Sequence, residues 1–161
     1  MLFTPSLKLR KLDLDDVPLL VKYADNRKIS DRIINIPYPY REPDAVFRLG
    51  YVNKGFKEGS RFVFAIANKE TNAFVGEISL HLEQGQKAQL GYWIGEPHWG
   101  NGYAKEAIQS IVKFGFEKLE IDVIYALCHE ENIASQKVVT FNDFVEKGRA
   151  GRVIHYELNR N

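Results

Sequence analysis

Two glycines in the segment EPHWGNGYAKEA, residues 96–107, are spaced as in loops that bind an anion in front of a helix. Gly100 and Gly102 flank a single asparagine, and a run of good helix formers follows at once. The first N–H groups of a helix have no partner within the helix and carry a partial positive charge. A glycine loop in front of them leaves space for a phosphate to reach those groups.

The two common phosphate motifs do not fit this turn. A Walker loop beginning at Gly95 requires lysine where Asn101 stands, and a dinucleotide fingerprint beginning at Gly100 requires glycine where Lys105 stands. A nucleotide-binding module is therefore disfavoured. The turn is either a simple entry into a helix or an anion cradle of another kind.

Other residues capable of chemistry are few. Cys128 is the only cysteine, which excludes an intramolecular disulfide, and it lies in an apolar run typical of a core strand. The four histidines show no metal-ligand spacing, so no metal is expected. Asn132 precedes a predicted helix, where Asn is a favoured N-cap, and Ser135 falls in the first turn of that helix.

The elements that position these residues follow from hydrophobic periodicity. Strands are expected at 7–12, 61–66, 74–82, 89–94 and 123–128, with two more near 144 and 153. A first helix is expected after Asp15, which would be its N-cap, and further helices are expected from about Glu42, after Gly102 and after Asn132. Short turns join the strands between 61 and 94 into an antiparallel meander. The helix between 94 and 123 makes the flanking strands parallel. The fold class is therefore α+β, with a mixed, mostly antiparallel sheet of about seven strands flanked by helices.

Composition limits the class of protein. The chain has 161 residues, 45% hydrophobic and 27% charged, which fits a single domain over 1–161. A formal net charge of +1 without runs of like charge disfavours a nucleic-acid partner. The start lacks the charge and apolar pattern of a signal peptide, and the apolar runs are far shorter than the ~20 residues of a membrane span, so a cytoplasmic protein without a membrane partner is expected.

The turn and its surroundings resemble the GNAT acetyltransferase superfamily, within it the branch of ribosomal-protein N-terminal acetyltransferases. The family's pyrophosphate loop reads Gln/Arg-x-x-Gly-x-Gly/Ala, and here Trp99, Gly102 and Ala104 occupy its fixed places. Tryptophan in the first place is typical of this branch. The segment ENIAS, residues 131–135, is similar to the family's Asn-x-x-Ser element. The order of elements matches from about residue 7 to residue 158.

The resemblance implies acetyl-CoA as cosubstrate. The backbone amides of residues 101–104 would bind its pyrophosphate, namely those of Asn101, Gly102, Tyr103 and Ala104. The two parallel strands would splay apart, and pantetheine would pair with the backbone of Tyr92, Trp93 and Ile94. Asn132 would hydrogen-bond pantetheine in addition to capping its helix.

The resemblance also implies direct transfer: an amine attacks the thioester, a tetrahedral intermediate forms and CoA thiolate leaves. Ser135 would protonate the thiolate, although many family members use tyrosine. An ammonium must first lose a proton, and Gln89 stands in the region where many members have glutamate. Glu77 is the best substitute for this base and His81 a weaker one, with a solvated polar strand face as the alternative. Backbone carbonyls and ordered water also remain open as the proton acceptor.

The acceptor is the least determined part. The segment INIPYPY, residues 34–40, lies where members of the family form the wall of the acceptor slot. Tyr38 and Tyr40 would then be its aromatic walls. The alternative is that both tyrosines pack within an ordinary proline-rich loop. By resemblance the acceptor is a protein N-terminal amine, and the enzyme is compatible with a homodimer. A small amine (amino acid, polyamine or aminoglycoside) and a non-catalytic acyl-CoA-binding domain are the alternatives. Asp143-Phe144 replaces the family's usual Gly-Phe, with the turn geometry expected to persist.

Overall fold

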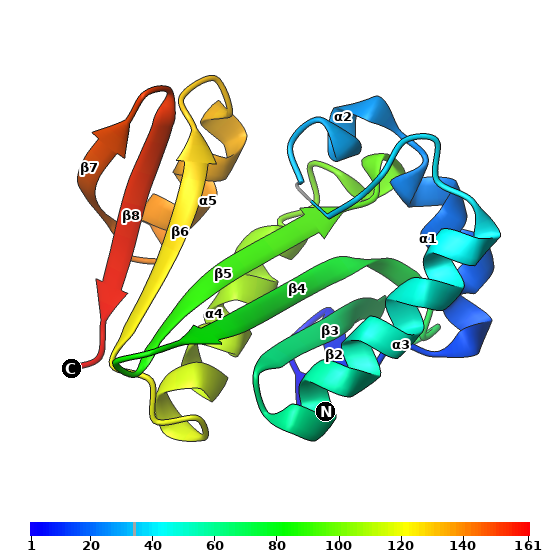
Figure 1. Cartoon of the computed structure of the whole chain (residues 1–161), viewed down its shortest axis with the longest axis horizontal. Coiled ribbons are helices and arrows are strands. Elements are labelled where there is room, and N and C mark those ends of the chain that lie inside the picture. The colour runs from blue at the N-terminus through cyan, green and yellow to red at the C-terminus, as the bar shows by residue number, and fades with distance from the viewer. Residues whose placement is uncertain (34) are drawn as a thin grey trace.

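The computed structural model describes residues 1–33 and 35–161. One mixed sheet forms its centre, with strand order β1-β2-β3-β4-β5-β6-β8-β7 (Figure 1). The strands are β1 (Leu2–Phe3), β2 (Leu7–Arg10), β3 (Arg61–Asn68), β4 (Phe74–Glu83), β5 (Lys87–Ile94), β6 (Val123–His129), β7 (Val145–Ala150) and β8 (Val153–Asn159). Neighbouring strands are antiparallel except β5 and β6, which are parallel. The predicted fold class is confirmed, with the two-residue β1 as an additional edge strand.

Helices cover both faces of the sheet. They are α1 (Val17–Ala24), α2 (Arg27–Ser30), α3 (Glu42–Glu58), α4 (Tyr103–Glu117) and α5 (Ile133–Phe141), with short 3-10 turns at Leu14–Asp16 and Glu96–His98. Helix α3 begins at the predicted Glu42 and ends at Gly59, whose φ of 69° is the left-handed geometry that stops a helix. Asp143 also adopts a positive φ, 69°, so the turn expected without glycine is present.

The entry to α1 differs from the prediction. Asp13, not Asp15, is the capping residue: its side chain accepts a hydrogen bond from the backbone N–H of Asp15, and Asp16 reaches back to the N–H of Asp13. Asp16 is buried and also pairs with Arg10 at 2.8 Å, which ties this turn to β2. The acidic run therefore caps a 3-10 turn ahead of the helix, two residues earlier than the helical spacing indicated.

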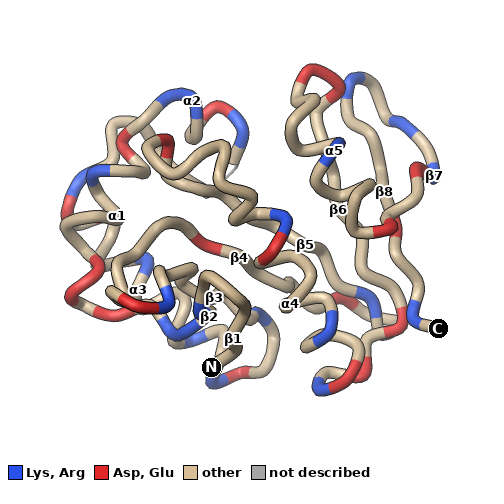
Figure 2. Tube along the Cα trace, turned by 180° about the vertical axis from the view of Figure 1, so that it is seen from behind, with Lys and Arg blue, Asp and Glu red and all other residues tan. Residues whose placement is uncertain are grey.

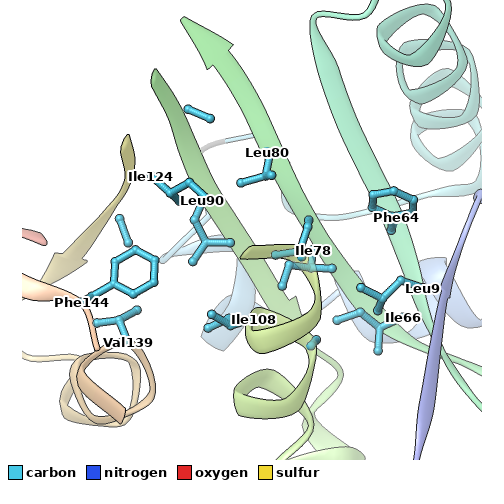
Figure 3. Packing of buried hydrophobic residues seen from close by; sticks show 14 of the residues in the cluster. Leu9, Phe64, Ile66, Ile78, Leu80, Leu90, Ile108, Ile124, Val139 and Phe144 are labelled. Atoms are coloured by element: carbon cyan, nitrogen blue, oxygen red, sulfur yellow. The ribbon is translucent and has the colours of Figure 1, made fainter. Parts of the chain in front are cut away.

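Two apolar layers hold the helices on the sheet. On one face, α4 and α5 pack against the strands from β2 to β6 (Figure 3). This layer includes Leu9, Phe64, Ile78, Leu90 and Ile124 from the strands, Ile108 and Val139 from the two helices, and Phe144 after α5. On the other face, α1 and α3 cover the first half of the sheet through Leu20, Ala45, Val52, Val63, Phe74 and Trp93. Helix α3 crosses in front of β2 and β3, whereas β6, β8 and β7 form an arm that diverges from the rest (Figure 1).

Charge is mixed over the whole trace, with Lys and Arg next to Asp and Glu in both halves (Figure 2). Among the described residues, no helix is both long and apolar enough to cross a membrane.

Candidate active site

The parallel pair β5–β6 opens into a gap after a short stretch of pairing. Only residues 87–89 of β5 pair with residues 123–125 of β6, and beyond Gln89 and Tyr125 the strands diverge (Figure 1). The splay that the family resemblance implied is therefore present. The rest of β5 retains its hydrogen bonds to β4 but has an open second edge.

The alternation along β5 decides which backbone groups face the gap. The N–H of Gly95 donates to the carbonyl of Val75 on β4 at 2.8 Å, so the odd-numbered residues bond to β4 and the even-numbered ones point to the gap. Tyr92 and Ile94 thus present their backbone to the gap. Trp93 does not: its carbonyl points to β4, where a Cβ on Gly76 would approach it to 2.2 Å. The predicted backbone contact therefore suits Tyr92 and Ile94 but not Trp93.

The glycine turn has the geometry of an open cradle. Gly100 and Gly102 have φ of 83° and 74°, a region that glycine adopts without strain, and Gly102 is the N-cap of α4. A Cβ at either position would meet nothing within 4 Å. In the described part of the chain, the N–H groups of residues 101–104 have no acceptor, and the first bond of the helix joins the N–H of Glu106 to the carbonyl of Gly102 at 3.1 Å. These are the groups that an anion at a helix start would use.

Side chains around the turn hold it in place. The indole N–H of Trp99 donates to the carbonyl of Ile94 at 2.7 Å, which joins the loop to the end of β5. The Asn101 amide donates to the carbonyl of His98 at 3.1 Å, and the His98 ring lies 3.1 Å from the Tyr23 hydroxyl. Glu106, in the first turn of α4, accepts from the N–H of Ser6 at 2.6 Å. The cradle is thus fixed to the sheet on two sides.

At the other side of the gap, α5 brings its first turn to β5 and β6. The Ser135 hydroxyl is hydrogen-bonded to the Tyr92 hydroxyl and lies 3.4 Å from the Cys128 thiol. The Asn132 side chain accepts from the N–H of Ser135 at 3.3 Å, as expected of an N-cap. Burial raises the pKa of both the Tyr92 phenol and the Cys128 thiol, partly opposed by the Ser135 hydrogen bond, so both groups stay protonated near neutral pH.

Glu77 occupies a different environment from the one predicted. It is 2% exposed, its carboxylate lies 3.1 Å from the Arg48 guanidinium, and it accepts from the Trp93 indole at 2.8 Å. The polar face of β4 is therefore buried beneath α3 at Glu77 and Ser79, and only its end at Glu83 is exposed. A carboxylate engaged by a guanidinium and an indole has little capacity to take a proton from an amine, so this placement argues against Glu77 as the base.

The two tyrosines predicted to form the acceptor wall lie in different environments. Tyr38 is exposed, and the Arg27 guanidinium lies 4.7 Å from the centre of its ring. Tyr40 is 3% exposed and packs in the layer under α1 and α3, where burial, with Glu77 nearby, raises its pKa to about 12. Tyr40 cannot line an open slot in this arrangement, because its ring is covered. Ile34, the first residue of the predicted segment, lies outside the described residues.

Sequence reasoning missed two partners at the site. The Tyr92 side chain was not expected to meet Ser135, which is 43 residues away, and Arg48 was not expected to neutralise Glu77. The only available signal was indirect: Arg48 is a charged residue on the otherwise apolar stripe of a helix predicted to pack on the sheet. Within the described residues, no cluster of His, Cys, Asp and Glu has the grouping of a metal site.

Comparison with known proteins agrees with this geometry. Residues 6–145 match the family model described as an acetyltransferase (GNAT) domain. An uncharacterized N-acetyltransferase, p20 of Bacillus licheniformis, is 31% identical over 150 residues, which cover 91% of this chain and 83% of that protein.

Two solved structures share the fold at low identity. The ribosomal L7/L12 alpha-N-protein acetyltransferase RimL, in complex with coenzyme A, superposes with a TM-score of 0.85 at 20% identity and covers 97% of this chain and 95% of that one. The spermidine N-acetyltransferase from Vibrio cholerae, in complex with CoA and spermine, gives a TM-score of 0.78 at 22% identity, with 95% of each chain covered.

Proposed function

The chain belongs to the GNAT acetyltransferase family and is an N-acetyltransferase that uses acetyl-CoA, and from this premise we propose that it acetylates the N-terminal amine of a protein. The observation that carries the proposal is the gap between β5 and β6, with free helix N–H groups at the cradle and a serine hydroxyl across from β5. The named acceptor of RimL supports a protein substrate.

The residues present fit acetyl-CoA. The N–H groups of residues 101–104 would bind the pyrophosphate, since they have no acceptor within the described residues and the space beside Gly100 and Gly102 is open. The backbone of Tyr92 and Ile94 would pair with the pantetheine amides, and Asn132 would add a side-chain contact while it caps α5. Bound in this way, acetyl-CoA supplies the activated acetyl group.

The proton steps fall to the residues around the gap. As the amine attacks the thioester carbonyl and the C–S bond breaks, the Ser135 hydroxyl would donate a proton to the departing sulfur. The hydrogen bond between Ser135 and Tyr92 would allow the phenol to return a proton to the serine, and the phenol would regain its proton from water once the products leave the gap. The acceptor amine would lose its proton through ordered water to solvent, with a backbone carbonyl orienting that water, since Glu77 is engaged by Arg48. Positioning in the gap supplies much of the remaining rate.

Thermal unfolding in the presence of acetyl-CoA, CoA and ATP tests the cofactor part. At a hundredfold excess over Kd, a ligand of the native state adds ~2.7 kcal/mol, which raises the Tm by several degrees for a domain of this size. Both CoA species should raise the Tm and ATP should not. Equal shifts with all three would indicate a generic phosphate site.

Turnover tests the acceptor part. N-terminal peptides beginning with serine or alanine are compared with spermidine, the acceptor class named for the Vibrio cholerae structure, by following release of CoA thiol. Faster turnover of the peptides is expected. Turnover of spermidine alone would replace the protein acceptor with a small polyamine.

A further inference from the structure

One face of the sheet carries a row of polar side chains that leads to the gap. Register places Arg61 opposite His81, His81 opposite Gln89, Gln89 beside Tyr125 and Tyr125 opposite Glu157. Side chains at paired positions point to the same face. The row therefore crosses the sheet from β3 to β8 on the face that α3 covers only in part, at the last paired position before β5 and β6 separate.

Arg61 is a cation without a carboxylate partner in residues 1–33 and 35–161. Its guanidinium donates to the carbonyl of Tyr51 at 2.9 Å and lies 3.9 Å from the centre of that ring. Its Nε is buried and has no hydrogen-bond partner. The side chain passes beside Gly55 of α3, where a Cβ would approach the Arg61 Cβ to 2.8 Å. Glycine at 55 thus makes room for a partly buried guanidinium that forms no ion pair within the described residues.

The surroundings of Arg61 add positive charge. Arg48 lies 5.4 Å from the same Tyr51 ring, and its one carboxylate partner, Glu77, is already fully engaged. Burial, followed by Arg48 and Arg61, lowers the pKa of His81, with Glu83 opposing, so the imidazole is neutral near pH 7. Arg48, Arg61 and Glu77 together carry one net positive charge, and Glu83, the other carboxylate that acts on His81, is exposed and accepts a hydrogen bond from Tyr125 instead of pairing with Arg61. Partly buried charges are normally paired.

A short peptide bound with its amine at the reacting centre could contact this cluster. The His81 ring lies 3.1 Å from the Ser79 hydroxyl, and Ser79 pairs with Gly91, so β5 carries no side chain on this face at the position between Gln89 and Trp93. Arg61 stands two strands from β5, about 10 Å at ~4.8 Å per strand, and its register partner row at Gln89 lies three residues before Tyr92, roughly another 10 Å along β5. Together these displacements give a direct separation of about 14 Å. An extended chain covers ~3.3 Å per residue, so the second or third residue of an acceptor bound with its amine at the gap would reach the cluster once the lengths of the arginine and carboxylate side chains are added.

Resting on the proposed function, we propose that Arg61, with His81 and Tyr51 beside it, binds a carboxylate at the second or third residue of a peptide acceptor. The acceptor class is then a protein N-terminus with aspartate or glutamate close behind its first residue. A polyamine is disfavoured, because its ammonium groups would meet the uncompensated guanidinium.

The test compares matched tetrapeptides, Ala-Asp-Ala-Ala, Ala-Ala-Asp-Ala and the asparagine versions of both, in kcat/KM assays with acetyl-CoA. A charge-assisted hydrogen bond predicts about a tenfold advantage for at least one aspartate peptide. Arg61→Gln should abolish that advantage while leaving turnover of the asparagine peptides nearly unchanged, and Arg61→Lys should retain part of it. Lys54→Gln, an equal loss of charge on the exposed side of α3, should retain all of it.

Equal kcat/KM for aspartate and asparagine peptides, or a preference that survives Arg61→Gln, would overturn the proposal. The failure of the proposed function is a different result: no peptide is acetylated whatever its second or third residue. In that case, equilibrium binding of the same peptides to the CoA-loaded protein decides the carboxylate site by itself, and equal Kd values for the aspartate and asparagine forms would overturn it. If Arg61→Gln does not fold, Arg61→Lys and the wild-type comparison carry the decision.

Discussion

Ser135 gains its proposed role from what lies around it. Its hydroxyl meets a buried phenol on one side and a buried thiol on the other, and its backbone N–H is held by the Asn132 cap. A hydroxyl fixed in this way is oriented before substrate arrives, so little reorganisation is needed when a thiolate leaves. Tyr92 thereby combines two roles, a backbone that faces the gap and a side chain that positions the serine.

Ser135→Ala tests proton donation. Loss of a general acid typically costs a factor of about a hundred or more in kcat, so a fall of about that size is expected with little change in the Kd for acetyl-CoA. Fixed-time assays of CoA release measure kcat, and calorimetric titration measures the Kd for acetyl-CoA. Thr140→Ala, which removes an exposed hydroxyl from the far end of α5, is the control. Wild-type kcat in Ser135→Ala would exclude the serine as the donor.

Glu77 and Arg48 form a buried pair whose disruption should be costly. Glu77→Gln leaves the guanidinium half-paired below α3, and breaking a buried pair typically destabilises by about 3–5 kcal/mol. Urea unfolding measures this loss, which Arg48→Met in the same chain should largely restore. Glu58→Gln, which removes the exposed pair with Lys54, should cost less than about 1 kcal/mol. A stable Glu77→Gln protein with an altered pH–rate profile would instead reinstate Glu77 as the base.

At the scale of elements, the glycine turn is a strand-to-helix connection whose conformation and exposure serve a ligand. Gly102→Val introduces a β-branched residue at φ 74°, where strain costs about 1–2 kcal/mol, yet its Cβ meets no protein atom. We expect the variant to fold and to bind acetyl-CoA at least tenfold more weakly.

The matched control is Gly151→Val at the β7–β8 hairpin, with φ 59° and equally open surroundings. It carries a similar strain away from the cradle, so its Kd for acetyl-CoA should equal that of the wild type. A similar loss of affinity in both variants would attribute the effect to general destabilisation.

Element order, the parallel pair and the glycine turn could be predicted from the sequence because each depends on local spacing. Helix α3, for example, is bounded by Pro43 in its first turn and Gly59 at its end. Glu77 and Tyr40 could not be placed in this way. Their burial depends on where α3 lies on the sheet, and a carboxylate at an alternating position reads as solvated until its guanidinium partner is known. The Trp93 backbone was misassigned because the alternation of β5 is set by its register with β4.

At the scale of the whole molecule, the reaction gap separates two parts of one sheet. β1 to β5 form the first part with α1, α3 and α4, and β6, β8 and β7 form the second with α5. Residues 87–89 and 123–125 supply the only strand pairing between them in the described chain, together with the apolar layer that contains Val139 and Phe144. Acetyl-CoA bound in the gap would contact both parts, at the cradle and β5 on one side and α5 on the other.

Hydrogen exchange should therefore detect the ligand as a bridge. Acetyl-CoA is expected to slow exchange at the start of α5, along β6 and at Tyr92 and Ile94, because opening of the arm would now also break ligand contacts. The exchange rates of amides in α1, which lies outside the gap, should change little when they exchange by local opening and not by global unfolding. Protection limited to residues 101–106 would mean that only the pyrophosphate is held. The arm would then open independently of the ligand, and the role of Ser135 at the thioester would lose its structural basis.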